Sequence, residues 1–305
     1  MAEHRAHFDA RVTFANGGGL TADGFRLDVP TADVDEAEVA RLFVHHLGLA
    51  LVGSVELQNL SIHEEPHRGS RGIEAQPTAT ARRVVDLSHV IREGMITYPG
   101  LPAPVFTPHL TREQSIAKYA PGTQFAMDNI TMIGNTGTYL DSPFHRYEGG
   151  TDLAGLDLAT LVDLPAEVFH LRDVAPGGSG PREIPAAVFH DRDLRGAAVL
   201  LDTGWSDHFG TPEYAKGSPF LGAAGVAELV RQGVALVGID SLNIDDTESG
   251  GERPAHSGLL AAGIHVVEHL TNLDGLPARG ARFTAAPPAV ESFGTFPVRA
   301  FAIVG

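Results

Sequence analysis

The sequence predicts a mixed α/β domain that follows a smaller α+β unit. Short apolar segments of strand length alternate with a few helical patterns from Val84 onward, and a shorter series of the same kind occupies residues 8–62. A polar stretch rich in Arg, Pro, Gly and Thr, residues 64–83, separates the two series and is typical of a linker. We therefore expect an N-terminal α+β extension with its linker at residues 1–82 and the main α/β domain at residues 83–305.

Local patterns predict the elements of the N-terminal unit. Alternating apolar residues predict strands at residues 8–14, 25–29 and 51–62, and Gly17 to Gly19 indicate a turn after the first strand. Apolar residues at helical spacing predict a helix over residues 39–47, preceded by capping residues and ended by Gly48.

The main domain is expected to combine buried strands with a few helices. Apolar runs at residues 197–202 and 234–239 predict buried strands, and residues 223–232 and 257–262 show helical patterns. The chain contains 35 Gly and 20 Pro, which favour frequent turns between these elements.

Composition narrows the classes of function. The 305 residues are 43% hydrophobic and 20% charged, which excludes a disordered chain, collagen and a coiled coil. The absence of Cys excludes disulfides, thiolate zinc sites and a cysteine nucleophile, so carboxylates and 15 His remain as reactive groups. A net charge of −16 disfavours a nucleic-acid or anionic-membrane partner, and we expect a small-molecule partner instead. No apolar run has the length of a signal peptide or a membrane span, so we expect a cytoplasmic protein.

The most informative motif places a carboxylate and an imidazole four residues apart. Asp141 and His145 lie in a segment where Gly137 and Pro143 impose special backbone geometry, which suits a rigid site on a loop. The spacing alone leaves two interpretations open, because Asp141 could cap a turn while His145 lies on the surface.

This segment resembles the signature of the cyclase family, which includes bacterial kynurenine formamidase and isatin hydrolase. The family pattern is His-x-Gly-Thr-His-x-Asp-x-Pro-x-His, and the chain retains Gly137, Thr138, Asp141, Pro143 and His145 in register. Further matching segments begin at Asp86, Tyr98, Thr203, Gly238, His256, Val266 and Pro297. The resemblance covers residues 84–305. It implies a kynurenine formamidase-like, swivelling β/β/α fold and a homodimer or homotetramer.

Two departures from the family pattern concern the metal. In the hydrolases of the family the two leading histidines are metal ligands, and this chain has Asn135 and Tyr139 at those positions. The resemblance leaves Asp141, His256 and Glu268 as ligand-type positions, so a residual zinc or manganese ion held by these three residues stays open. Because an amide and a phenol are weak ligands, we expect a pocket without a metal cofactor.

Loss of the metal changes the expected chemistry. Hydrolysis in the family is expected to need water activated by the ion, whereas ring closure needs a shaped pocket and groups that move protons. We expect His145 to be the principal acid-base group, oriented by Asp141 or Glu268, and His256 to be a second proton carrier. Asn135 and Tyr139 would bind a substrate carbonyl in the space of the metal.

Several other residues are weaker candidates. Three aromatic residues on or beside the motifs could form an apolar wall for a ring-containing substrate or serve only in packing: Tyr98, Phe144 and Trp205. Asp245 and Asp246 could line the mouth of the pocket or belong to a solvated loop. One of His265 and His269, which flank Glu268, could contact a site residue from behind.

The sequence therefore predicts a cyclase of small-molecule secondary metabolism. The expected reaction is an acid-base catalysed, metal-independent condensation with loss of water, within a polyketide- or amino-acid-derived substrate. The first alternative is a metal-dependent hydrolase of a formamide or cyclic amide. The second is a small-ligand-binding protein without catalysis.

Overall fold

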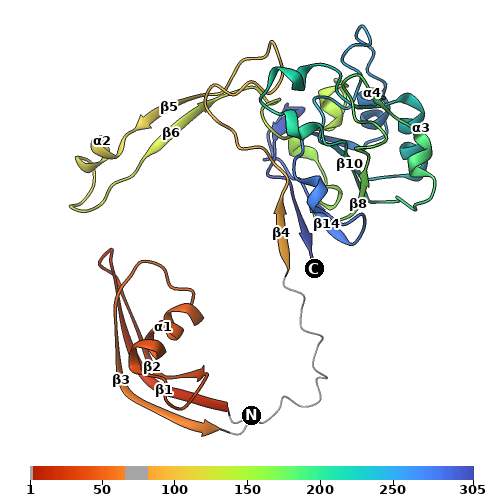
Figure 1. Ribbon diagram of the computed structural model, residues 1–305. Helices are drawn as coiled ribbons and strands as arrows, with labels where there is room; N and C mark the ends of the chain where they lie inside the picture. Colours follow the sequence, from red (N-terminus) through yellow and green to blue (C-terminus); the bar gives the residue numbers. More distant parts are fainter. Residues whose placement is uncertain (1–2, 66–81) are drawn as a thin grey trace. The chain divides into compact units, whose positions relative to one another are not determined.

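The computed structural model describes residues 3–65 and 82–305 (Figure 1). The chain falls into two compact units, Met1–Thr78 and Ala79–Gly305. Most of the linker predicted at residues 64–83 lies outside the described residues.

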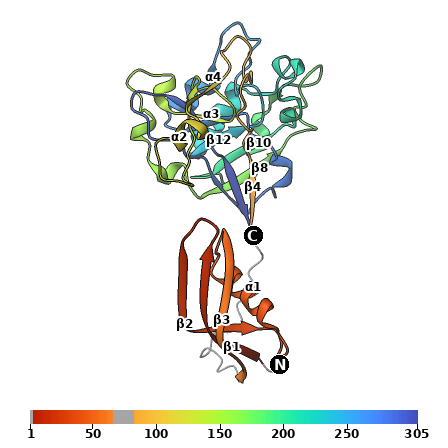
Figure 2. The same ribbon diagram turned by 90° about the vertical axis from the view of Figure 1, so that its left-hand side faces the viewer.

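The N-terminal unit is a three-stranded antiparallel sheet with one helix against it (Figure 2). The elements are β1 (Glu3–Phe14), β2 (Gly19–Val29), α1 (Glu36–His46) and β3 (Val52–Glu65), and the sheet order is β2-β1-β3. Asp35 caps α1 by accepting a hydrogen bond from the Glu38 amide, and α1 buries Val39 and Phe43 against Phe8 of β1. The α+β extension predicted from the sequence is confirmed.

A nine-stranded sheet forms the second unit. Its order is β15-β7-β13-β12-β10-β8-β14-β16-β4, and β13, β12, β10 and β8 are parallel to one another. The strands are β4 (Arg83–Asp86), β7 (Tyr139–Asp141), β8 (Leu164–His170), β10 (Ala198–Asp202), β12 (Leu236–Ile239), β13 (His265–Glu268), β14 (Ala281–Thr284), β15 (Thr295–Pro297) and β16 (Phe301–Val304). Two short strands, β9 (Glu183–Ile184) and β11 (Phe220–Leu221), pair separately.

Apolar side chains fill both faces of the central strands. Helices α3 (Ala223–Gln232) and α4 (Pro254–Ala261) pack on one face, where Val226 and Leu259 contact the cluster around Val199 and Val237. Leu200 and Leu236 point into a second apolar cluster on the other face. Burial on both faces explains why β10 and β12 are continuous apolar runs, as the sequence predicted.

Helix α4 begins three residues before the predicted start at residue 257. Pro254 occupies its first turn, and the carboxylate of Asp245 accepts hydrogen bonds from the amides of Ala255 and His256. Because the cap comes from a residue ten positions before Ala255 and not from the adjacent one, the pattern of apolar residues alone places the start too late.

A two-stranded antiparallel arm extends from the second unit (yellow in Figure 1). It consists of β5 (Val105–Leu110), α2 (Arg112–Ile116) and β6 (Met127–Thr131). Large apolar side chains along the arm are exposed: Val105, Phe106, Ile116, Phe125, Met127 and Ile130.

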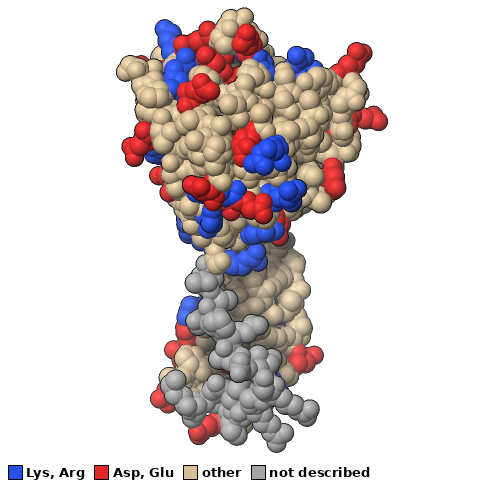
Figure 3. Space-filling model, turned by 90° about the vertical axis from the view of Figure 1, so that its right-hand side faces the viewer, with Lys and Arg blue, Asp and Glu red and all other residues tan. Residues whose placement is uncertain are grey.

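The surface of the second unit mixes charges of both signs. On the face shown in Figure 3, basic side chains lie beside acidic ones. Within the described residues, no helix has both the length and the apolar character needed to cross a bilayer.

The register of β7 assembles the functional site. Tyr139 lies opposite Glu268 of β13, and Asp141 lies opposite Thr295 of β15. Because β7 lies between these two strands, it brings together side chains that are more than a hundred residues apart.

Candidate active site

Asp141 and His145 are joined through a threonine. The buried carboxylate of Asp141 accepts a hydrogen bond from the Thr295 hydroxyl, and Thr295 Oγ1 lies 2.7 Å from His145 Nδ1. Because the Thr295 hydroxyl donates its hydrogen bond to Asp141, its oxygen can only accept from His145, so Nδ1 of His145 carries a proton and is the donor. With Nδ1 as the donor to Thr295, Nε2 is the nitrogen that can exchange a proton with a substrate, and the 35% exposure of this side chain makes it accessible.

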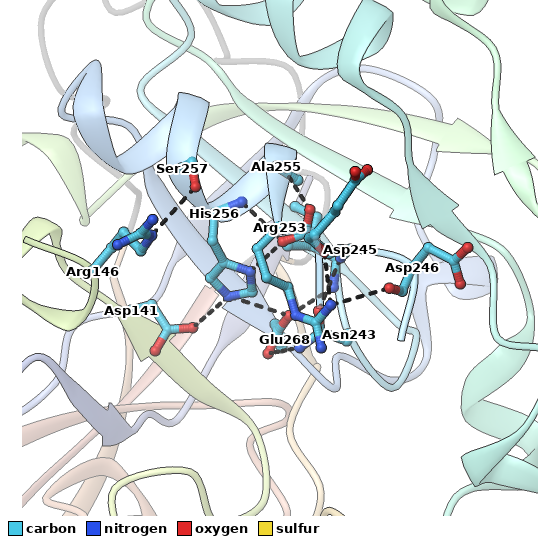
Figure 4. A network of polar contacts seen from close by, with 12 residues as sticks. Asp141, Arg146, Asn243, Asp245, Asp246, Arg253, Ala255, His256, Ser257 and Glu268 are labelled. Carbon is cyan, nitrogen blue, oxygen red and sulfur yellow. Dashed lines mark hydrogen bonds and ion pairs between the residues drawn. The ribbon is translucent and has the colours of Figure 1, made fainter. Parts of the chain in front are cut away.

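A second carboxylate and imidazole pair forms at the start of α4 (Figure 4). His256 Nδ1 lies 2.6 Å from Asp245 Oδ2, and the same carboxylate caps the helix. His256 Nε2 lies 3.5 Å from Asp141 Oδ2 and 3.7 Å from Glu268 Oε1. Asp245 therefore fixes the orientation of the ring and directs Nε2 toward two further carboxylates.

Glu268 is held at both of its oxygens. Oε1 accepts a hydrogen bond of 2.7 Å from the Ile244 amide, and Oε2 accepts one of 2.6 Å from the Tyr139 hydroxyl. The Asn243 amide approaches Oε2 at 3.5 Å. These donors satisfy a carboxylate that is almost completely buried.

These groups surround a cavity of about 160 Å³. Its lining consists of Asn135, Tyr139, His145, Arg146, Asn243, Arg253, His256 and Glu268. This volume is below the roughly 300–1,000 Å³ of typical ligand pockets, so the cavity suits the reacting end of a substrate.

Arginines add positive charge to the cavity lining. Arg253 Nη1 donates hydrogen bonds to the main-chain oxygens of Asp246 and Glu252, and Arg146 Nε donates one to Ser257 Oγ. Within the described chain, neither guanidinium forms an ion pair with a carboxylate. The cavity thus offers hydrogen-bond donors beside its carboxylates.

Burial and neighbouring charges shift the pKa values of the two central acids in opposite directions. Burial raises the pKa of Glu268 to about 7, although His256 opposes this shift. Burial also acts to raise the pKa of Asp141, but the contact with His256 and the proximity of His145 outweigh it and lower the pKa. Asp141 therefore stays ionised, while Glu268 can hold a proton near neutral pH.

The pKa of His256 is raised well above its usual value. Burial opposes protonation, but the charge of Glu268 and the contacts with Asp141 and Asp245 favour it more strongly. In contrast, burial raises the pKa of Tyr139 far above 10, and the charges of Glu268 and Asp141 add to this effect. Tyr139 is therefore a neutral phenol and a hydrogen-bond donor.

The residues present can hold one divalent ion. Donor atoms of Asp141, His145 and His256 lie within 4.8 Å of one another, and Asp141 Oδ2 is buried without a hydrogen-bond donor in the described structure. His256 also donates Nδ1–H to a carboxylate, as metal-binding histidines commonly do. One carboxylate and two imidazoles suit zinc or manganese.

This set of three possible metal ligands differs from the set that the family resemblance implies. His145 takes the place of Glu268, whose two oxygens already accept hydrogen bonds. The positions of Asn135 and Tyr139 do not fit a second ion, because the phenol is neutral and donates its proton to Glu268.

The structure brings six of the predicted site residues together. Asn135, Tyr139, His145, His256 and Glu268 line the cavity, and Asp141 lies directly behind it. His145 is oriented through Thr295 by Asp141, whereas Glu268 contacts His256 instead.

The three predicted wall residues are not among those that line this cavity. Trp205 and Tyr98 pack with Tyr214 and Leu242 in a separate cluster, and Phe144 is half-buried in the turn before His145. Of the two histidines that flank Glu268, His269 contacts Tyr139, and His265 contacts Thr160.

Sequence reasoning missed two residues that orient the imidazoles. No sequence pattern singles out Thr295, and the sequence leaves Asp245 at a pocket mouth or in a solvated loop, whereas its carboxylate is completely buried. Pro254 was a usable signal for Asp245, because a proline in the first turn predicts a nearby helix start that needs a cap.

Fold and site together define an α/β enzyme with paired carboxylates and imidazoles in a small cavity. Residues 85–246 match the family described as "Putative cyclase". The chain belongs to this cyclase family.

Three similar proteins illustrate the family. Kynurenine formamidase of Geobacillus thermodenitrificans is 35% identical over 174 residues, which cover 56% of this chain and 77% of that protein. A solved structure described as a potential metal-dependent hydrolase with cyclase activity has a TM-score of 0.59 and 26% identity, covering 74% of this chain and 99% of that one. An isatin hydrolase bound to the product analogue thioisatinate has a TM-score of 0.63 and 24% identity, covering 73% and 92%.

These comparisons confirm the predicted kynurenine formamidase-like fold and the class of enzyme, a cyclase or related amide hydrolase.

Proposed function

We propose that the protein catalyses ring closure with loss of water in a small carbonyl-rich substrate of polyketide or amino-acid origin, without a metal cofactor. The observation that carries this proposal is the pair of oriented imidazoles at one cavity, His145 through Thr295 to Asp141 and His256 to Asp245. Two positioned imidazoles can remove one proton and deliver another within a single substrate.

For closure of a carbon–carbon bond, the steps balance as follows. His145 Nε2 removes a proton from a carbon next to a carbonyl, and this carbon attacks a second carbonyl of the same molecule. The π electrons move onto that carbonyl oxygen, which takes a proton from His256. His256, now without its proton, takes a second proton from the attacking carbon. The new hydroxyl leaves as water with the proton held by His145, so a conjugated ring forms and both imidazoles return to their starting states.

The polar lining of the cavity supports a substrate with several carbonyl groups. The amides of Asn135 and Asn243 and the guanidinium groups of Arg146 and Arg253 are hydrogen-bond donors at the cavity wall. Such donors can bind carbonyl oxygens and the negative charge that develops on them. Folding a flexible chain in this small space supplies the proximity that ring closure needs.

The experiment is a screen of linear polycarbonyl and aminoaryl oxo-acid compounds by mass spectrometry. Ring closure lowers the mass of a compound by one water, whereas hydrolysis either opens a cyclic amide with a gain of one water or splits a formamide into two products. We expect a loss of water that persists after treatment with a chelator. A gain of water that stops after chelation would contradict the proposal.

A metal-dependent amide hydrolase is the second candidate, favoured by the cluster of Asp141, His145 and His256 and by Asp141 Oδ2, which accepts no hydrogen bond from the described residues. Kynurenine formamidase and a potential metal-dependent hydrolase are among the similar proteins. A bound divalent ion would supply Lewis-acid activation of water. Turnover of N-formylkynurenine or isatin that depends on added zinc or manganese would favour this candidate.

We further propose that the protein acts as a homodimer or homotetramer in which the arm of β5 and β6 packs on a second copy. Two facts support this proposal. Two-stranded arms are marginally stable in water, and this arm exposes six large apolar side chains. Light scattering of the purified protein should give the mass of two or four chains, and Phe106→Asp with Ile130→Asp should reduce it. A monomeric wild type would contradict this proposal.

A further inference from the structure

A buried chain of hydrogen bonds leads away from the cavity behind Glu268. The Tyr139 hydroxyl lies 2.6 Å from Glu268 Oε2 and 3.3 Å from His269 Nε2. His269 Nδ1 lies 2.8 Å from the hydroxyl of Tyr214. All four side chains are at most 3% exposed, and only Tyr139 and Glu268 line the cavity.

The direction of these hydrogen bonds follows from Glu268. When its carboxylate is ionised, both oxygens are acceptors, so the Tyr139 hydroxyl donates to Oε2. The Tyr139 oxygen can then only accept from His269, which must carry its proton on Nε2. The His269 ring is completely buried with a hydroxyl group at each nitrogen, so it is neutral and its bare Nδ1 accepts a hydrogen bond from the Tyr214 hydroxyl.

Further contacts fix His269 and Tyr214, the two residues of this hydrogen-bond chain that lie farthest from the cavity. His269 has a φ of 57°, a conformation that few residues other than glycine adopt, and its main-chain oxygen accepts a hydrogen bond from the Thr138 hydroxyl. Trp205 Nε1 donates to the main-chain oxygen of Tyr214, and the Trp205 and Tyr214 side chains pack in one cluster. Trp205, predicted to contact substrate, thus supports Tyr214.

We propose that His269 and Tyr214 are positioning residues that hold the Tyr139 hydroxyl as a donor to Glu268. This inference rests on the proposed function, in which Glu268 faces the proton carrier His256 at 3.7 Å. The phenol fixes one oxygen of Glu268 and the Ile244 amide fixes the other, so the carboxylate cannot rotate away from His256. Tyr139 therefore orients Glu268 in the cavity wall, at a position where the family hydrolases have an imidazole.

Glu268→Gln tests the donor and acceptor directions in this chain of hydrogen bonds. The Ile244 amide keeps the oxygen of the new side chain on its side, so the NH₂ group faces Tyr139. The Tyr139 hydroxyl must then donate to His269 Nε2, and the His269 proton moves to Nδ1, where it is donated to Tyr214. Tyr139→Phe removes the acceptor of Nε2–H and favours the same Nδ1–H tautomer, so it serves as a second variant if Glu268→Gln does not fold.

The tautomer is read by ¹⁵N NMR of histidine-labelled protein, with His269→Asn used to assign the signal. At a pH well above 7, where Glu268 is ionised, we expect Nε2–H in the wild type and Nδ1–H in Glu268→Gln and Tyr139→Phe. The control Tyr147→Phe, which removes a phenol that donates to the Ser257 carbonyl, should leave the wild-type tautomer unchanged. An Nδ1–H tautomer in the wild type, or one tautomer in all variants, would overturn the inference.

Turnover provides the second readout. Tyr214→Phe removes one hydrogen bond behind the cavity, so kcat should fall by about tenfold with KM unchanged. If Tyr147→Phe lowers kcat as much as Tyr214→Phe does, the role of Tyr214 is merely structural and the inference is overturned. The NMR measurement needs no substrate, so failure of the proposed reaction and failure of this inference are distinguishable.

Discussion

The two sides of the cavity use histidine in opposite ways. On one side His256 donates to Asp245 and faces Asp141 and Glu268, and its pKa is raised although the ring is buried. On the other side both ring nitrogens of His269 contact hydroxyl groups, and burial together with the nearby His89 lowers its pKa to about 3, although Asp141 opposes this shift. Three carboxylates close to its ring nitrogens make the first imidazole a proton carrier, whereas burial between two phenols makes the second a neutral spacer.

The largest effect is expected from His145→Ala. Loss of the group that accepts the substrate proton should lower kcat by about 10²–10⁴-fold, while the melting temperature changes little because the side chain is partly exposed. Steady-state rates on the substrate found by the screen for water loss measure this effect.

His170→Ala is the matched control. His170 is 40% exposed and its Nδ1 lies 2.7 Å from the buried carboxylate of Asp202, but it does not line the cavity. Equal rates for wild type and His145→Ala would remove His145 from the mechanism.

Asp245→Ala should reduce both stability and activity. It removes the partner of His256 Nδ1 and the cap of two amides of α4, so the free energy of unfolding should fall by about 1–3 kcal/mol. Urea unfolding measures the stability change.

The neighbouring Asp246 provides the comparison. Its ion pair with Arg182 is partly exposed, so Asp246→Ala should cost no more than about 1 kcal/mol. If the two alanine variants lose the same stability, the assigned role of Asp245 is wrong.

A smaller effect, confined to stability, is expected at His265. Burial lowers its pKa to about 4, whereas the pKa of a histidine in the unfolded chain is about 6.5. Between these values the unfolded chain binds a proton that the folded chain excludes, so the free energy of unfolding falls as pH drops, by at most about 1.4 kcal/mol per pH unit.

His265→Gln should therefore lose less stability than the wild type when urea unfolding is compared at about pH 7 and about pH 5. Its activity should be unchanged, because His265 contacts Thr160 and does not line the cavity. Identical pH dependence in the two proteins would contradict the pKa assigned to His265.

The residues that could be predicted from the sequence are those with a local or motif signal. Asp141 and His145 belong to one motif, and the continuous apolar runs of β10 and β12 predict a buried sheet. Thr295 had no such signal, because a single threonine becomes functional only when β15 pairs with β7. The role of Asp245 likewise depends on the place where α4 begins.

The departure at Tyr139 shows how sequence and structure complement each other. The sequence reveals that an imidazole ligand is replaced, but not which group receives the phenol proton. The pairing of β7 with β13 places the hydroxyl against Glu268, and the positive φ of His269 places a second imidazole behind it. Both contacts depend on tertiary structure.

The central claim is that Asn135 and Tyr139, which replace metal-binding histidines of the family hydrolases, hold no additional ion beside Asp141 and leave a cavity that works by acid-base catalysis. Zinc content per chain, measured after dialysis against zinc, tests this claim most directly. The wild type should retain no more than one ion, and Asn135→His combined with Tyr139→His should retain one more, because it restores two imidazoles beside Asp141. Two ions in the wild type, or equal zinc content in both proteins, would contradict the account.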